Sequence, residues 1–166
     1  MSASATNPTR SRPDRDAYLL HPVHFSSKRL DWRTPEITYQ ILYAEFEFEF
    51  DFDPCPSNPT FDGLSVPWGK TNFVNPPYGR EIGQWIKKGH DEWLIGKTVV
   101  FLIPSRTDTR WWHDYVMDAD EIRFCEGRLK FDGAKNGAPF PSAIVVFLAN
   151  SPNIERVKAE RAAEWR

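Results

Sequence analysis

Four consecutive residues in the middle of the chain, Asn75, Pro76, Pro77 and Tyr78, have the chemistry to hold an amine. The two prolines remove two backbone N–H donors and fix φ at successive positions, so the carbonyl of Pro76 points in a set direction. Asn75 adds a side-chain carbonyl beside it, and Tyr78 adds an aromatic ring. A short apolar stretch, residues 71–74, precedes the four, which predicts that they form a rigid corner at the end of a strand.

Two fixed acceptors and a ring suit a planar amino group carried by an aromatic base. The acceptors bind the two amino hydrogens, and the Tyr78 ring stacks on the base. Hydrogen bonds drawn out of the plane of the base reduce the conjugation of the amine and expose its lone pair. An otherwise poor nucleophile then becomes able to attack a methyl donor. The alternative explanation for the same four residues is an ordinary strand-ending turn.

The segments around this corner alternate between helical and strand patterns. Apolar spacing predicts a helix over residues 34–46, and residues 46–52 alternate with period two, as in a strand. Further along, the patterns predict a strand at 71–74, a helix at 80–94, a strand at 97–104, a short helix at 109–118, a hairpin or bulged strand pair at 121–131 and a strand at 142–149. This order is typical of a shortened open α/β sheet.

Ligands of open α/β sheets bind beyond the carboxyl ends of the strands, so the residues that follow each strand matter most. In this chain they are residues 53–58, 75–78 and 104–108, which we expect to line one rim. The acidic residues that alternate with the phenylalanines of residues 46–52 are expected to be solvated rather than to bind a metal. We assign no metal site.

Length and composition limit the possible classes of protein. A chain of 166 residues with 40% hydrophobic residues is expected to form a single domain, and a net charge of −2 gives no global sign of a nucleic-acid binder. Two cysteines, no secretory signal and no membrane-length apolar run favour a reducing cytoplasm and no membrane partner. We predict a flexible arm at residues 1–26, the folded domain at 27–150, and a charged C-terminal helix or tail at 151–166. A monomer is favoured.

An ordered series of short motifs runs through the chain. It consists of "TP" at 34–35, "FDPC" at 52–55, "DGL" at 62–64, "NPPYG" at 75–79, "LIPSRTDTRWW" at 102–112 and "GRLKF" at 127–131, with single tryptophans at 68 and 85. Over most of residues 32–148 the chain resembles the phage-type DNA N6-adenine methyltransferases, the small Dam-like family. The resemblance implies a shortened Rossmann-like fold with a mostly parallel open sheet, S-adenosylmethionine as the methyl donor, and a phage or prophage gene expressed in the bacterial cytoplasm.

The same resemblance implies roles for residues around the predicted rim. Thr34 and Pro35 shape the methionine end of the cofactor pocket, and Asp53, followed by Pro54, meets the amino group of the cofactor. Asp62 accepts a hydrogen bond from the cofactor adenine, although an ordinary Asp-Gly turn explains this residue equally well. The loop after Asp53 lacks the glycine-rich turn usual in methyltransferases, which implies an abbreviated cofactor site.

For a DNA substrate, the target adenine has to be flipped out of the duplex, because a stacked base cannot reach the corner. Tyr78 is expected to hold one face of the base and Phe131 the other, with a buried core side chain as the alternative for Phe131. The remaining DNA-binding candidates are Arg106, Thr107, Asp108, Arg110 and Arg128. The arginines contact phosphates, while Thr107 and Asp108 brace the loop. Arg80, Lys87, Lys88 and Lys130 extend this basic rim, unless all these charges are simply solvated.

The sequence therefore predicts an enzyme that methylates N6 of adenine in DNA. A chain this short has no room for a separate recognition domain, so short or relaxed sequence specificity is expected. Two alternatives stay open: a protein-glutamine N5 methyltransferase, which can use the same corner on a planar amide, and a catalytically inactive DNA-binding relative.

Overall fold

The computed structural model of the chain describes residues 33–45 and 50–164, so the predicted arm at residues 1–26 lies outside the described part. In chain order the elements are α1 (Glu36–Glu45), β1 (Thr71–Val74), α2 (Ile82–Leu94), β2 (Thr98–Pro104), α3 (Arg110–Asp114), a 3-10 helix (Val116–Asp118), β3 (Glu121–Phe124), β4 (Ser142–Phe147) and α4 (Asn153–Glu164). Apolar periodicity predicted most of these elements to within a few residues. The fold class is mixed α/β, as expected.

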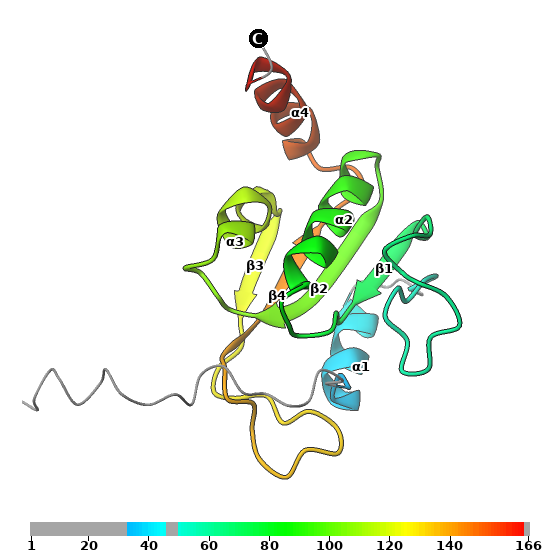
Figure 1. The fold of residues 1–166 in the computed structure, drawn as a ribbon, viewed down its shortest axis with the longest axis vertical. Helices are drawn as coiled ribbons and strands as arrows, with labels where there is room; N and C mark the ends of the chain where they lie inside the picture. The colour runs from blue at the N-terminus through cyan, green and yellow to red at the C-terminus, as the bar shows by residue number, and fades with distance from the viewer. Residues whose placement is uncertain (1–32, 46–49, 165–166) are drawn as a thin grey trace, which may run out of the picture.

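The four strands form one open sheet in the order β1-β2-β4-β3 (Figure 1). β1 and β2 are parallel, whereas β4 is antiparallel to both β2 and β3. Three strands therefore run in one direction and β4 returns between two of them, so the sheet is mixed rather than mostly parallel as expected. The connection from β3 to β4 contains no helix, and without a crossover helix the chain returns antiparallel.

The segment before β1 runs beside it in the same direction. Residues 46–49 of the predicted strand at 46–52 lie outside the described part, but Phe52 forms a parallel bridge with Asn72. The backbone N–H of Phe73 donates to the carbonyl of Phe52 at 3.3 Å. The carboxylate of Asp51 accepts the N–H of Thr71 at 3.0 Å. This acidic side chain therefore fixes the start of β1 instead of being merely solvated.

Helices cover both faces of the sheet, which explains why every residue of β2 is buried. Figure 1 shows α2 and α3 in front of the sheet. On this side Phe101 of β2 packs beneath Gly89 of α2. On the other side the Tyr39 ring of α1 meets the Phe73 ring edge-on, with centroids 5.2 Å apart. Leu42 of α1 is fully buried in the same core.

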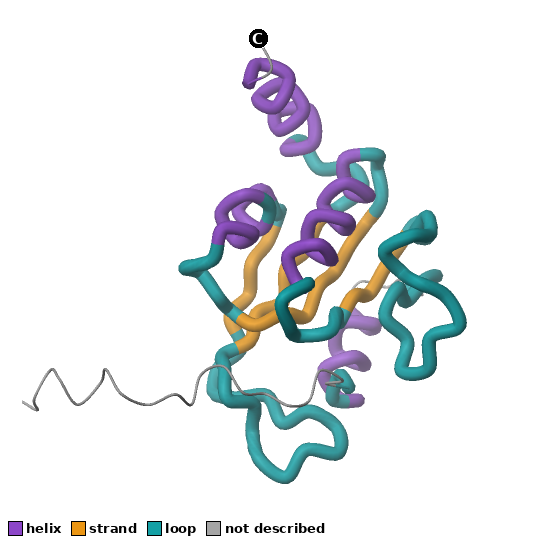
Figure 2. The backbone as a smooth tube through the Cα atoms, viewed as in Figure 1, coloured by secondary structure: helices purple, strands orange, loops and turns teal. Residues whose placement is uncertain are grey.

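The predicted hairpin at residues 121–131 is wrong. Only residues 121–124 form a strand, β3, and its partner is β4, some twenty residues further along the chain. Residues 125–141 form a long loop, drawn at the lower end of the sheet in Figure 2. A hydrogen bond from the N–H of Ala138 to the carbonyl of Leu129, 2.8 Å long, closes this loop on itself. Residues 126–128 and 130 are exposed, so they provide no buried face for a second strand.

The adjacent tryptophans of α3 differ in burial. Trp112 is buried, and its ring stacks on that of Phe124 at 6.4 Å with an interplanar angle of 15°. Trp111 is only partly buried. One turn of helix cannot bury two consecutive side chains on the same side.

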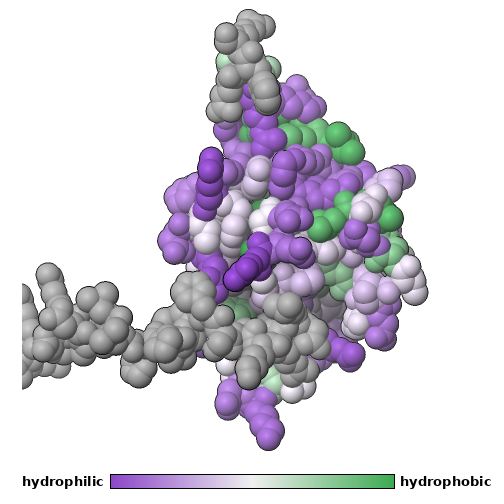
Figure 3. Space-filling model, in the orientation of Figure 1, coloured by the Kyte–Doolittle hydropathy of each residue, from purple (hydrophilic) through white to green (hydrophobic). Residues whose placement is uncertain are grey.

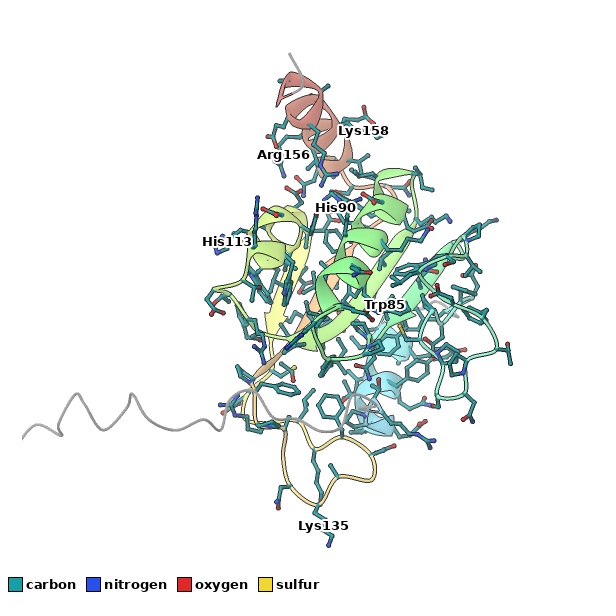
Figure 4. All side chains as sticks on the ribbon, in the orientation of Figure 1. Trp85, His90, His113, Lys135, Arg156 and Lys158 are labelled. Atoms are coloured by element: carbon teal, nitrogen blue, oxygen red, sulfur yellow. The ribbon has the colours of Figure 1, made fainter. Side chains whose placement is uncertain are left out.

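α4 lies at the end of the molecule away from the long loop (Figure 4). Ile154 and Val157 bury its apolar side, and Arg161 approaches Nδ1 of His90 at 3.3 Å. The other ring nitrogen of His90, Nε2, lies 2.9 Å from the carboxylate of Asp118. Burial lowers the pKa of this histidine in spite of the carboxylate. The neutral ring thus has a structural role in docking α4.

The face shown in Figure 3 is mainly hydrophilic, with separate apolar patches. Within residues 33–45 and 50–164 there is no helix with both the length and the apolar character needed to cross a membrane. The same residues contain no cluster of three or more His, Cys, Asp or Glu side chains able to hold a metal ion.

Two glycines of α2 provide a test of the contact between helix and sheet. A Cβ at Gly89 lies 2.3 Å from the Phe101 ring, whereas one at Gly83 meets nothing closer than 3.4 Å, on Trp111. Gly89→Ala is therefore expected to lower the free energy of unfolding by about 1–3 kcal/mol through overpacking. Gly83→Ala, the matched control, should leave it unchanged or slightly higher, because alanine favours helix. Urea unfolding of both variants measures the difference, and equal stabilities contradict the close approach of α2 to β2.

Candidate active site

The predicted rim forms at the carboxyl ends of neighbouring strands. Asp53 directly follows Phe52, which pairs with β1, and Asn75 directly follows Val74, the last residue of β1. Because these segments are parallel, both residues emerge at the same edge of the sheet. The arrowhead of β1 and the long loop at residues 125–141 lie at this end in Figure 1.

The carboxamide of Asn75 is held by a residue far away in the sequence. Its Nδ2 donates to the hydroxyl oxygen of Thr34 at 3.1 Å, and both side chains are partly buried. This contact brings the Thr-Pro motif, which precedes α1, onto the corner after β1. Pro35 and Pro76 are buried beside them, whereas Pro77 is exposed.

Tyr78 lies under a group of aromatic rings. Its hydroxyl donates to the carbonyl of Leu102 in β2 at 3.0 Å, and burial raises the pKa of this phenol well above its usual value. The rings of Phe131 and Phe140 meet the Tyr78 ring edge-on, with centroids 5.9 and 5.3 Å away. Because Tyr78 is only 7% exposed, a base reaches the face of its ring only after the surrounding side chains move.

Phe131 thus contacts Tyr78 edge-on, rather than facing it across a gap for a base, and is a buried residue of the core. Its role in holding the base stays a prediction. Phe140 was missed by sequence reasoning. The available signal was its setting in "APFPS", where prolines on both sides hold an aromatic residue in an extended loop. Both phenylalanines come from the loop at residues 125–141, which therefore covers the corner.

Asp53 combines exposure with partial desolvation. Its side chain is open to solvent, yet the protein surrounds it closely enough that desolvation raises the pKa of its carboxyl. The N–H of Cys55 donates to Oδ1 at 2.8 Å and works in the opposite direction. The pKa of Tyr39 on α1 is raised mainly by burial, and the charge of Asp53 is the next largest cause. An exposed carboxylate of this kind suits a cationic ligand.

Asp62 forms a local turn. Its carboxylate accepts hydrogen bonds from the N–H of Leu64 at 3.0 Å and the hydroxyl of Ser65 at 2.5 Å, and these bonds hold its pKa below the usual value. The turn packs on the rim, because a Cβ at Gly63 lies 2.1 Å from the carbonyl oxygen of Pro54. Asp62 is therefore close to the loop after Asp53, with its oxygens already engaged in the turn.

The DNA-binding candidates lie on two neighbouring loops. The N–H of Ser105 donates to the carbonyl of Pro141 at 2.9 Å, which joins the β2–α3 loop to the loop at residues 125–141. The first loop carries Arg106, Thr107 and Asp108, Arg110 follows it as the first residue of α3, and the second loop carries Arg128. Arg110 is 93% exposed and its Nε lies 3.6 Å from Asp114.

The loop after β2 is braced, although not by the residues expected. The hydroxyl of Thr109 donates to the carbonyl of Arg106 at 2.7 Å, and a ring nitrogen of His113 donates to the carbonyl of Thr107 at 2.9 Å. Lys87 and Lys88 form ion pairs with Asp91 and Glu92 along α2. These two lysines are therefore already paired within the protein.

The strand ends thus carry an oriented amide, a tyrosine beside it and an exposed carboxylate on an α/β sheet. Groups of these kinds can bind a cationic ligand and a planar amine side by side. The model of the family described as DNA N-6-adenine-methyltransferase (Dam) matches residues 24–152, and the chain belongs to this family. Membership confirms the resemblance found in the motifs and implies a DNA adenine methyltransferase. No curated protein and no solved structure matches the chain.

Proposed function

We propose that the chain transfers a methyl group from S-adenosylmethionine to N6 of an adenine flipped out of DNA. The observation that carries this proposal is the carboxamide of Asn75, bound through Nδ2 to Thr34 at the end of β1. With the donor end of the amide engaged in this way, Oδ1 is the end whose chemistry suits a hydrogen of an amine. This oxygen is buried, so an amine reaches it only after neighbouring groups move. The carbonyl of Pro76 supplies the second acceptor.

The residues at the rim fit the proposed cofactor. A carboxylate at Asp53 complements the ammonium group of S-adenosylmethionine, and Thr34 and Pro35 border the same edge of the sheet from the other side. When bound, the cofactor supplies a methyl carbon on a positively charged sulfur: the amine nitrogen bonds to this carbon, the carbon–sulfur bond breaks with its electron pair going to sulfur, and one amino proton leaves.

The part of the protein in this reaction is to hold the amine. Oδ1 of Asn75 and the carbonyl of Pro76 accept the two amino hydrogens, which localises the lone pair on nitrogen and directs it away from the acceptors. Neither acceptor has to be charged. Tyr78 packs against the base, whose entry requires Phe131 or Phe140 to turn aside, and a flipped base costs a few kcal/mol to unstack.

DNA is proposed to bind along the loops that carry Arg106, Arg110 and Arg128. Two loops offer few side chains for reading bases, and each good bidentate base contact supplies about 1–3 kcal/mol of discrimination. Two or three such contacts specify a short site. Phosphate contacts then provide much of the affinity.

Arg106→Ala and Arg110→Ala are each expected to weaken DNA binding about equally for unrelated sequences. Each phosphate contact releases about one counterion when DNA binds. Loss of one contact should therefore lower the magnitude of the slope of log affinity against log salt by about one. Arg156→Ala is the matched control, since Arg156 pairs with Glu160 on α4 at the far end of the molecule (Figure 4). Binding to unrelated duplexes over a range of salt gives the slopes, and unchanged slopes in both loop variants rule out phosphate contacts here.

The function itself is tested by incubating the protein with methyl-labelled S-adenosylmethionine and DNA, followed by analysis of the nucleosides. N6-methyladenine in the DNA is the expected product. Label on a protein glutamine instead points to the N5 methyltransferase alternative. Failure to bind the cofactor, measured by calorimetric titration, points to an inactive DNA-binding relative.

A further inference from the structure

Thr34 makes a contact that its expected place in the cofactor pocket does not explain. Its hydroxyl oxygen accepts the Nδ2 hydrogen of Asn75 at 3.1 Å across a sequence separation of 41 residues. The bond is partly buried, so water does not readily replace it. It involves the residue on which the proposed reaction depends.

The backbone around Thr34 is fixed on both sides. The carbonyl of Arg33 accepts the N–H of Asp132 at 3.1 Å in an isolated antiparallel bridge. The buried Pro35 follows, and its carbonyl accepts the N–H of Thr38 at 2.9 Å in the first turn of α1. A residue before proline is confined to extended backbone, and a β-branched side chain has few rotamers. The hydroxyl of Thr34 is therefore held in one place.

A fixed acceptor matters to Asn75 because its carboxamide has two ends of nearly the same shape and opposite polarity. Only Oδ1 can accept a hydrogen from an amine, while Nδ2 presents two hydrogens of its own. With the amide turned around, the amino group of the substrate meets another donor. The hydroxyl of Thr34, which can donate as well as accept, holds the carboxamide in place, and in the structure it does so with Nδ2 as the bound end.

We propose that Thr34 is a positioning residue that holds the Asn75 carboxamide at the end of β1, in the place from which it accepts a hydrogen of the target amine. This inference rests on the proposed methyl transfer. It separates Thr34 from Asp53: Thr34 acts on the chemical step through Asn75, whereas Asp53 acts on cofactor affinity.

Thr34→Val and Thr34→Ser test the inference. Valine has the shape of threonine without the oxygen, and serine keeps the hydroxyl. Thr34→Val is expected to lower kcat about tenfold, the worth of one hydrogen bond of about 1.4 kcal/mol, while the Kd values for cofactor and DNA change less than about twofold. Thr34→Ser should stay close to the wild type. A kcat for Thr34→Val within twofold of the wild type, an equal loss in both variants, or a loss seen in cofactor affinity instead of kcat overturns the inference.

Asn75→Ala provides an independent test. Alanine has no carboxamide to position, so adding Thr34→Val to Asn75→Ala should lower the remaining rate less than about twofold. A full tenfold loss in that background overturns the positioning role. Where Asn75→Ala is too slow to measure, the comparison of Thr34→Val with Thr34→Ser decides alone.

The contact can also be observed without any turnover. The side-chain NH₂ signals of Asn75 in a ¹⁵N correlation spectrum, assigned by their loss in Asn75→Asp, should shift in Thr34→Val and stay in place in Thr34→Ser. Unshifted signals in Thr34→Val overturn the contact itself. A wild-type protein that methylates no adenine but shows the expected shift overturns the proposed function, whereas an active wild type with an unaffected Thr34→Val overturns only the positioning role.

Discussion

Asn75→Ala is expected to slow methyl transfer by about a hundredfold to a thousandfold. The side chain supplies one of the two acceptors for the target amine, and preorganised polar groups aimed at a reacting centre are worth this much in other enzymes. Single-turnover transfer from labelled cofactor measures the step directly. Asn75→Asp keeps an acceptor oxygen and should retain more activity than the alanine variant.

The fold should hardly change in Asn75→Ala. The residue is only partly buried, and the hydrogen bond it loses, from Nδ2 to Thr34, contributes about 1 kcal/mol. The control is Asn150→Ala, because Asn150 is exposed beyond β4 at the opposite edge of the sheet. Transfer by Asn75→Ala at the wild-type rate, with Asn150→Ala equally active, removes Asn75 from the reaction.

Local patterns were enough to predict the elements that support this corner. The apolar run at residues 97–104 became the fully buried β2, and the helical spacing at 80–94 became α2. These local patterns were sufficient because an element that is buried needs apolar residues at the spacing of a helix or a strand. β3 was different. Its partner β4 lies across a 17-residue loop, and no local period records which distant strand it will join.

In the site, too, the local features could be predicted and the tertiary contacts could not. The four residues of the corner and their position after a strand were visible in the sequence, since a strand end and two prolines are local features. The bond between Asn75 and Thr34 joins residues 41 positions apart in the chain, and the cover of Phe131 and Phe140 over Tyr78 comes from a loop without periodicity. Such contacts follow only from tertiary packing.

Asp53→Asn is expected to weaken the binding of S-adenosylmethionine about tenfold to a hundredfold. A charge-assisted contact between a carboxylate and an ammonium group is worth about 1.5–3 kcal/mol, and asparagine keeps the shape and the acceptor for the Cys55 N–H while removing the charge. Calorimetric titration of both proteins gives the Kd values. DNA affinity should change less, since the proposed partner of Asp53 is the ammonium group of the cofactor, and an equal loss of cofactor and DNA binding indicates a general defect instead.

The pH dependence of cofactor binding separates this role of Asp53 from a purely structural one. Desolvation raises the pKa of the carboxyl, so the folded protein takes up the proton at a higher pH than an ordinary aspartate does. Cofactor affinity in the wild type should therefore fall as the pH drops through mildly acidic values, whereas in Asp53→Asn it should stay flat. The substitution should weaken cofactor binding but not the fold. Because the folded state disfavours the ionised carboxyl, Asp53→Asn at neutral pH should unfold at the same temperature as the wild type or higher. A pH profile shared by both proteins, or a lower Tm for Asp53→Asn, contradicts the assignment of this carboxylate to the cofactor.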